Sequence, residues 1–245
     1  MSREDHAMNS NPVIVALDLP RDEALELADS LRGRVAWLKV GMTLFYAEGP
    51  AIVARLCEKG FDVFVDLKLH DIPHQVAGAA AEIARLGAGM FTVHASGGVA
   101  MMRAAVESSR RAAEEVGLPA PCVLGVTVLT STDAAGLVEI GVARDAAEQV
   151  RLLAQLAHTA GVDGVVCSPH EAAEMRELLG EGALVVTPGI RPQWSETGDQ
   201  ARIATPTAAL AAGASHLVIG RPITAAPVPA EAVARILSEI EGANQ

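Results

Sequence analysis

Residues 63–73 read VFVDLKLHDIP, an apolar strand that ends in a run of charges. β-Branched and aromatic residues fill its first part without turn formers, which is typical of a buried strand. Because strand side chains alternate between two faces, we predict that Asp66 and Lys68 share one face, with Leu67 and Leu69 on the other. Opposite charges on one face of an apolar strand cost desolvation energy unless they pair or take part in chemistry.

The Asp66–Lys68 pair has an ordinary structural explanation, an ion pair on a half-exposed edge strand. Asp71 adds a third charge and extends the pattern to D-x-K-x-x-D. This third charge, together with what the rest of the chain supplies, favours a functional site.

Outward from this stretch, apolar strands alternate with amphipathic helices along the chain. The expected strands are residues 13–19, 37–41, 63–69, 90–95, 122–129, 164–168, 184–186 and 216–220. The expected helices span about 20–32, 44–59, 73–86, 144–160, 206–212 and 229–240, with two more starting near 98 and 168. Such alternation indicates a parallel sheet covered by helices. Eight units without a linker predict a single-domain α/β fold, a (β/α)8 TIM barrel over residues 12–245, with a doubly wound open sheet as the runner-up. The polar residues 1–11 are expected to form a flexible tail.

Composition narrows the class of protein. Half of the 245 residues are apolar but only 3% are aromatic, so the core must be built from Ala, Val, Leu and Ile. The formal net charge of −11 argues against nucleic-acid binding, which needs a basic surface. Three scattered cysteines without C-x-x-C spacing indicate a reducing compartment, and no apolar run approaches membrane-spanning length. We therefore expect a cytoplasmic protein without a membrane or nucleic-acid partner.

Polar residues gather at one end of the predicted strands. Each lies at or just past the carboxyl end of a strand, and in a barrel these ends form the rim where active sites are built. The residues are Asp18, Lys39, Asp66, Lys68, Thr130, Arg191 and Arg221. Singly, each has a plain structural explanation, such as a cap, a turn or an extended lysine. Their shared position predicts one active site.

The last two strand ends predict where a phosphate would bind. Phosphate sites in such barrels often use the loops after strands seven and eight. These loops read PGIR at residues 188–191 and GRP at residues 220–222, combining glycines with the guanidinium forks of Arg191 and Arg221. Residues 192–202 between them are polar and are a candidate lid. Neither a G-x-G-x-x-G nor a Walker-type loop is found in the sequence.

The ordered set of motifs resembles the orotidine 5′-phosphate decarboxylase family. Residues 66–73, DLKLHDIP, are similar to its signature on strand three. Supporting segments are VALDL at 15–19, LKVG at 38–41, VHASGG at 93–98, VTVLTS at 126–131, TPGIR at 187–191 and VIGRPI at 218–223. The resemblance implies a (β/α)8 barrel that acts as a homodimer with shared active sites. It also implies orotidine 5′-monophosphate as the substrate, uridine 5′-monophosphate as the product, and no metal or organic cofactor.

The resemblance also implies a role for each residue. Lys68 would donate a proton to the product carbon, and Asp66 would lie beside the substrate carboxylate with Lys39 and Lys68 on its flanks. Asp71 would reach the site of the other subunit near the ribose. The remaining contacts would be Asp18 and Lys39 to ribose hydroxyls, Thr130 to the pyrimidine edge, and Arg191, Gln200, Gly220 and Arg221 to the phosphate.

One departure and two alternatives remain. Many relatives carry Asn-Thr after D-I-P, whereas this chain has His74 and Gln75, so we assign no substrate contact to Gln75. A related sugar-phosphate decarboxylase on the same barrel, which would ordinarily need a divalent metal, is the nearest alternative. A barrel that binds nucleotides without catalysis is the other. Four other histidines lack metal-ligand spacing: His94, His158, His170 and His216. We interpret them as strand-end, helix or packing residues, with His94 lining the site as the alternative.

Overall fold

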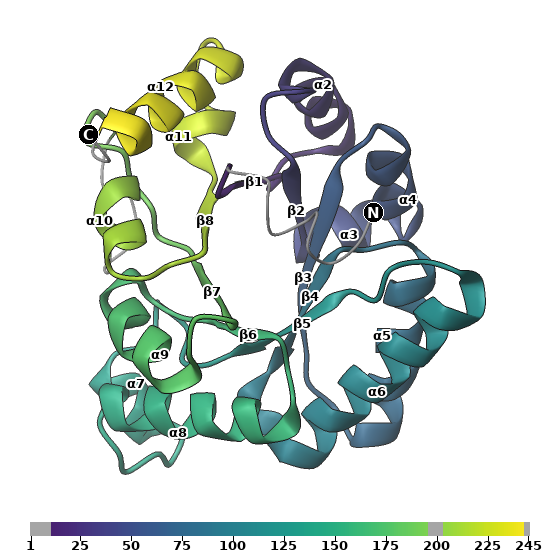
Figure 1. Ribbon diagram of the computed structural model, residues 1–245, viewed down its shortest axis with the longest axis vertical. Coiled ribbons are helices and arrows are strands. Elements are labelled where there is room, and N and C mark those ends of the chain that lie inside the picture. Colours follow the sequence, from purple (N-terminus) through teal and green to yellow (C-terminus); the bar gives the residue numbers. More distant parts are fainter. Residues whose placement is uncertain (1–10, 196–202, 243–245) are drawn as a thin grey trace.

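The computed structural model describes residues 11–195 and 203–242, and within these residues eight strands form one closed barrel (Figure 1). Each strand is parallel to the next in sequence order, and β8 closes the barrel by pairing with β1. The strands are β1 (Val13–Ala16), β2 (Trp37–Gly41), β3 (Asp62–Leu69), β4 (Met90–His94), β5 (Cys122–Val126), β6 (Gly164–Val166), β7 (Leu184–Thr187) and β8 (His216–Ile219). This confirms the predicted (β/α)8 TIM barrel and excludes the open sheet.

The helices lie around the outside of the strands in Figure 1. They are α2 (Arg21–Leu31), α3 (Met42–Glu48), α4 (Ala51–Glu58), α5 (Pro73–Arg85), α6 (Gly98–Val116), α7 (Ala134–Glu139), α8 (Ala146–Ala160), α9 (Ala172–Leu179), α10 (Pro206–Ala211), α11 (Arg221–Thr224) and α12 (Pro229–Gly242). Two 3₁₀ turns, η1 (Ala95–Gly97) and η2 (Pro169–Glu171), precede α6 and α9. Within the described residues, no helix combines the length and the apolar character that crossing a membrane requires.

The strands separate two apolar cores because their side chains alternate. Trp37 packs inside the barrel with Phe64 and Met90, whereas Leu38 and Val40 belong to the layer between strands and helices. Small and branched aliphatic residues dominate both cores, as the composition predicts. The inner core fills the lower part of the barrel, and the polar residues at its carboxyl end lie above it.

Helix 44–59 was predicted as one element, and that prediction is wrong. The structure has α3 and α4 instead, because Gly49 ends α3 with φ 70 and donates its N–H to the carbonyl of Phe45 at 2.8 Å. Pro50 follows and has no N–H to continue the helical ladder. The break leaves two short helices, and α3 begins at Met42, directly after β2.

Two short helices occupy segments for which no helix was predicted. Helix α7 begins after Asp133, whose carboxylate accepts the N–H of Gly136 at 2.9 Å. Helix α11 starts at Arg221, directly beyond Gly220. Strands β1 and β5 also end earlier than predicted, at Ala16 and Val126. The polar residues Asp18 and Thr130 therefore lie on the loops that follow these strands at the barrel rim.

Candidate active site

A cavity of about 480 Å³ opens at the carboxyl ends of the strands. Ala16, Phe64 and Val218 of the inner core form part of its lining. Most of the residues predicted from the sequence line this one cavity, namely Asp18, Lys39, Asp66, Lys68, Thr130, Arg191, Gly220 and Arg221. The carboxyl end of the barrel therefore brings together side chains from strands and loops that are far apart in the sequence.

Four charges of alternating sign form a row on one wall of the cavity. Lys39 Nζ lies 3.1 Å from Asp18 Oδ1 and 3.7 Å from Asp66 Oδ2. Lys68 Nζ lies 2.9 Å from Asp66 Oδ1. The row comes from three neighbouring segments, the loop after β1, then β2, then β3.

The burial of the side chains differs along this row, and it decides which ion pairs interact strongly. The side chains of Lys39 and Asp66 are 9% and 15% exposed, whereas Asp18 is 63% exposed. Ion pairs between exposed groups are screened by water and salt, while buried or partly buried pairs are screened much less. The strongly interacting centre of the row is therefore Lys39–Asp66–Lys68, with Asp18 at its solvent end.

Asp66 stays ionised despite its burial. Burial alone would raise the pKa of the Asp66 carboxyl, but the ammoniums of Lys39 and Lys68 oppose it, and hydrogen bonds from Lys68 and Thr92 add to their effect. Together they hold the pKa of Asp66 below its usual range. The cavity therefore contains a fixed negative charge between two cations at neutral pH.

Lys68 reaches this position through an irregular backbone. Its φ is 53, and among the described residues no other non-glycine residue has a positive φ. Such a conformation costs on the order of 1–3 kcal/mol and persists only where surrounding structure imposes it. Lys68 and Asp66 face the same cavity, as predicted. They do so through the irregular backbone at Lys68 and not through the regular alternation of strand side chains.

Two guanidiniums lie at another part of the cavity wall. Arg191 is buried, and its Nη1 donates to the carbonyl of Ile190 at 2.9 Å. Burial lowers the pKa of Arg191, and the charge of Arg221 lowers it further. The two guanidiniums line one cavity and repel each other, so an anion bound between them would be stabilised. The arrangement suits a phosphate.

A model of the family described as "Orotidine 5′-phosphate decarboxylase / HUMPS family" matches residues 11–236. The chain belongs to this family. It is 54% identical over 233 residues to orotidine 5′-phosphate decarboxylase of Halorhodospira halophila, covering 95% of this chain and 97% of the relative. It is 50% identical over 231 residues to the enzyme of the same name from Paramagnetospirillum magneticum, covering 94% of this chain and 98% of the relative.

Solved structures share this fold, and one of them carries the same name as the relatives. Orotidine 5′-phosphate decarboxylase from Lactobacillus acidophilus superimposes with a TM-score of 0.84 at 40% identity, over 94% of this chain and 99% of that one. An uncharacterized conserved protein from Geobacillus kaustophilus superimposes with a TM-score of 0.82 at 43% identity, over 94% and 100% of the two chains. The resemblance in the motifs is thus confirmed along nearly the whole chain.

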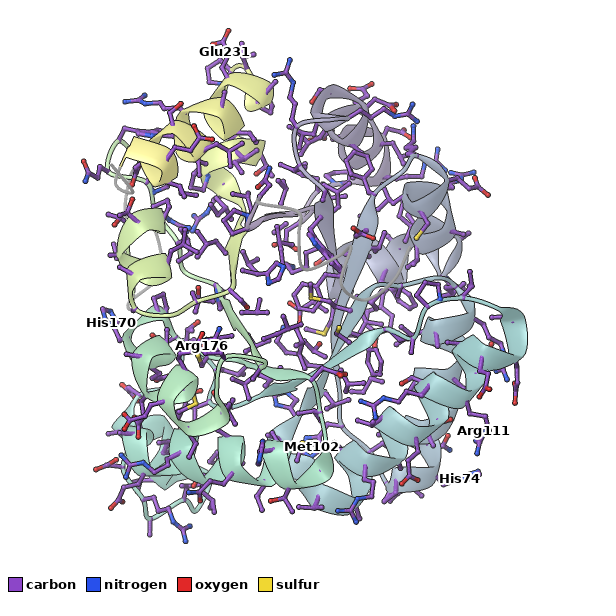
Figure 2. The ribbon with its side chains drawn as sticks, viewed as in Figure 1. His74, Met102, Arg111, His170, Arg176 and Glu231 are labelled. Atoms are coloured by element: carbon purple, nitrogen blue, oxygen red, sulfur yellow. The ribbon has the colours of Figure 1, made fainter. Side chains whose placement is uncertain are left out.

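Among the described residues, one predicted site residue, Asp71, is not part of the cavity wall. Asp71 is exposed beyond the end of β3, where its Oδ1 accepts the N–H of Ile72 at 2.6 Å. Gln200, predicted to contact the phosphate, lies outside the described residues, as does most of the candidate lid. Of the two residues that depart from the family pattern, His74 points away from the barrel at the outer edge of the molecule (Figure 2).

The sequence analysis missed two buried residues at the site. Thr92 of β4 is fully buried and donates a hydrogen bond to Asp66 Oδ1 at 3.0 Å. Cys167 lines the cavity with 1% of its surface exposed, and burial raises the pKa of its thiol. A polar residue at an inward-facing position of an apolar strand was the available signal for Thr92.

Proposed function

We propose that this protein decarboxylates orotidine 5′-monophosphate to uridine 5′-monophosphate, a step of pyrimidine biosynthesis. The alternating row Asp18–Lys39–Asp66–Lys68 inside a 480 Å³ cavity is the observation that carries the proposal. Family membership supports it, and the relatives at 50–54% identity carry the name of this activity.

The proposed chemistry needs a cation at the reacting carbon. Loss of CO₂ leaves an anion in the plane of the pyrimidine ring, where the ring's π system gives it little stabilisation. The ammonium of Lys68, already fixed by Asp66 at 2.9 Å, would stabilise this developing charge and then donate a proton to the carbon. The electrons of the broken C–C bond thus end in a new C–H bond, and CO₂ leaves.

The free energy contributed by one ion pair shows how many such contacts the reaction needs. At about 4 Å and an effective dielectric near 20, an ion pair contributes roughly 4 kcal/mol, which is about three decades of rate. Several preorganised contacts must therefore act together. Binding of the phosphate, remote from the reacting carbon, would contribute by assembling the site and excluding water.

Other cavity residues would hold the rest of the substrate. We propose that Asp18 and Lys39 bind the ribose hydroxyls and that Thr130 reads the pyrimidine edge. The phosphate would lie between the guanidiniums of Arg191 and Arg221. The backbone of Gly220 and the side chain of Gln200 would complete this phosphate site.

The direct test is to add orotidine 5′-monophosphate to the purified protein and follow the loss of its ultraviolet absorbance, with and without EDTA. We expect turnover at the same rate in both, because the proposed mechanism uses no metal or organic cofactor. Absence of turnover contradicts the proposed activity. Turnover of a sugar-phosphate substrate that EDTA abolishes would favour the sugar-phosphate decarboxylase instead.

We propose further that the protein acts as a homodimer in which Asp71 completes the site of the partner subunit. Asp71 lies outside the wall of its own cavity. The side chain of its neighbour Ile72 is 63% exposed, and that of Tyr46 is 76% exposed. A subunit interface at this position would bury the side chain of Ile72, which is favourable. The acidic composition and three cysteines that form no disulfide among the described residues fit a location in the cytoplasm.

Mixing two inactive variants tests the shared site. Lys68→Ala and Asp71→Ala subunits should each be inactive alone, whereas heterodimers contain one site with both residues intact. We expect activity to reappear after the two variants exchange subunits. If mass spectrometry demonstrates heterodimers and no activity returns, the sites are not shared.

A further inference from the structure

The ladder between β3 and β4 is interrupted next to the row of charges. Val65 pairs with Phe91 and the next pair is Leu69 with Val93. Strand β3 therefore advances four residues where β4 advances two. The irregular segment holds Asp66 and Lys68, so the interruption places both charged side chains in the cavity.

Thr92 is the β4 residue opposite this interruption. Its Oγ1 accepts the backbone N–H of Lys68 at 2.9 Å and lies 3.0 Å from Asp66 Oδ1, to which it donates. A hydroxyl can accept and donate at the same time, and valine, which has the same shape, can do neither. The Thr92 hydroxyl thus takes the place of a ladder partner for a residue with φ 53.

The carboxylate that Thr92 contacts is the one that fixes the lysine. Asp66 Oδ1 accepts from both Thr92 Oγ1 and Lys68 Nζ. Thr92 therefore connects to Lys68 twice, directly at the backbone and through Asp66 at the ammonium. It is fully buried and is not part of the cavity wall, so it would act on the substrate only through these two residues.

We propose that Thr92 is a positioning residue for the reaction: its hydroxyl holds the backbone of Lys68 and the carboxylate of Asp66 in the arrangement that places the ammonium at the reacting carbon. The proposal rests on the proposed decarboxylation. Displacement of a reacting group by about 1 Å can cost about 100-fold in rate. Loss of the hydroxyl should therefore appear in kcat, while binding of the nucleotide, which other residues hold, should change little.

The test compares Thr92→Val, Thr92→Ser and wild-type protein by steady-state kinetics and by the dissociation constant for uridine 5′-monophosphate. We expect Thr92→Val to lower kcat by at least about tenfold, with KM and the dissociation constant within about threefold of wild type. Thr92→Ser keeps the hydroxyl and should recover kcat to within about threefold. Thr187→Val is the matched control, since Thr187 is equally buried and, among the described residues, its hydroxyl donates only to the carbonyl of His216, at 3.4 Å.

Two results would overturn the proposal. The first is a kcat of Thr92→Val within about twofold of wild type. The second is a kcat of Thr92→Ser that falls as far as that of Thr92→Val, which would assign the effect to packing of the methyl group. If Thr92→Val does not fold, the same comparison of Thr92→Ala with Thr92→Ser decides. Failure of the wild-type protein to decarboxylate the substrate contradicts the proposed function instead. In that case crystal structures test the positioning, which is wrong if Lys68 keeps its positive φ and its contact with Asp66 in Thr92→Val.

Discussion

Asp66 lies between two ammoniums, and this position decides what the loss of its charge should do. Its carboxylate fixes Lys68 at 2.9 Å and Lys39 at 3.7 Å. In the proposed complex the same charge would face the carboxylate of the substrate, and like charges at this range repel each other. Asp66 would thus both hold the cation in place and weaken binding of the ground state.

Replacing Asp66 with Asn separates these two effects. The amide can still accept from Lys68, but it carries no charge. We expect kcat to fall by about 100-fold or more, whereas KM should stay equal or decrease because the repulsion is gone. Steady-state kinetics check this. A higher KM with unchanged kcat would place Asp66 in substrate binding alone.

At the scale of residues, charge could be predicted from the sequence and fine geometry could not. Asp66 and Lys68 are conspicuous because charges are rare in an apolar strand. Thr92 gives only the weak signal of a neutral polar residue facing inward in an apolar strand, and its importance depends on the interrupted register between β3 and β4. That interruption involves two strands at once, so no local pattern in either reveals it.

At the scale of elements, the end of β2 must leave room for the charge row. A Cβ added at Gly41 would lie 2.7 Å from Asp18 Oδ1 and 3.1 Å from Lys39 Nζ. Contacts this short force one partner to move. The exposed carboxylate of Asp18 is the more mobile of the two, so it would be displaced.

We predict that Gly41→Ala breaks the contact between Lys39 and Asp18 while the barrel stays folded. KM should rise by about tenfold, since the hydrogen bond from a ribose hydroxyl to the Asp18 carboxylate would be lost, and kcat should change less. Gly182→Ala is the control, because open space surrounds that position and its loop precedes β7 at the other end of the barrel. Unchanged kinetics in Gly41→Ala would show that Asp18 is not needed where it lies.

Prediction of the elements succeeded where periodicity was regular and failed at short interruptions. The eight strands were found because each is a buried apolar run between turn formers. The helix predicted for 44–59 contains Gly49 and Pro50, and these two residues outweighed its apolar pattern. Helix α7 has only six residues, too few for a periodic pattern to be distinguished from a loop.

At the scale of the whole molecule, the two ends of the barrel have different tasks. The charged cavity occupies the carboxyl end, while the amino end is packed by residues such as Trp37 and His216, whose rings meet edge to face at 6.0 Å. Burial lowers the pKa of His216 to about 4. The histidine is therefore neutral in the folded protein at pH values where an unfolded chain would bind a proton.

This difference predicts an acid-dependent loss of stability. Between pH 6.5 and about 4, the unfolded chain is protonated at His216 and the folded one is not, so the free energy of unfolding falls as pH falls, by at most about 3 kcal/mol. His216→Phe keeps a ring against Trp37 and should reduce this dependence. Thermal unfolding at several pH values measures it, with His158→Gln at an exposed position as the control. An identical pH dependence in His216→Phe and wild type would contradict the assignment.

The central claim is that a rigidly held ammonium at the mouth of the barrel makes the ring anion accessible, and Lys68→Ala tests it most directly. The measurement is the decarboxylation rate of this variant together with its affinity for uridine 5′-monophosphate. The control is Lys59→Ala, because Lys59 pairs with Asp29 at 2.7 Å on the outer surface. We predict a rate at least about a thousandfold lower with nucleotide binding still measurable. A rate near that of the wild-type protein would contradict the account.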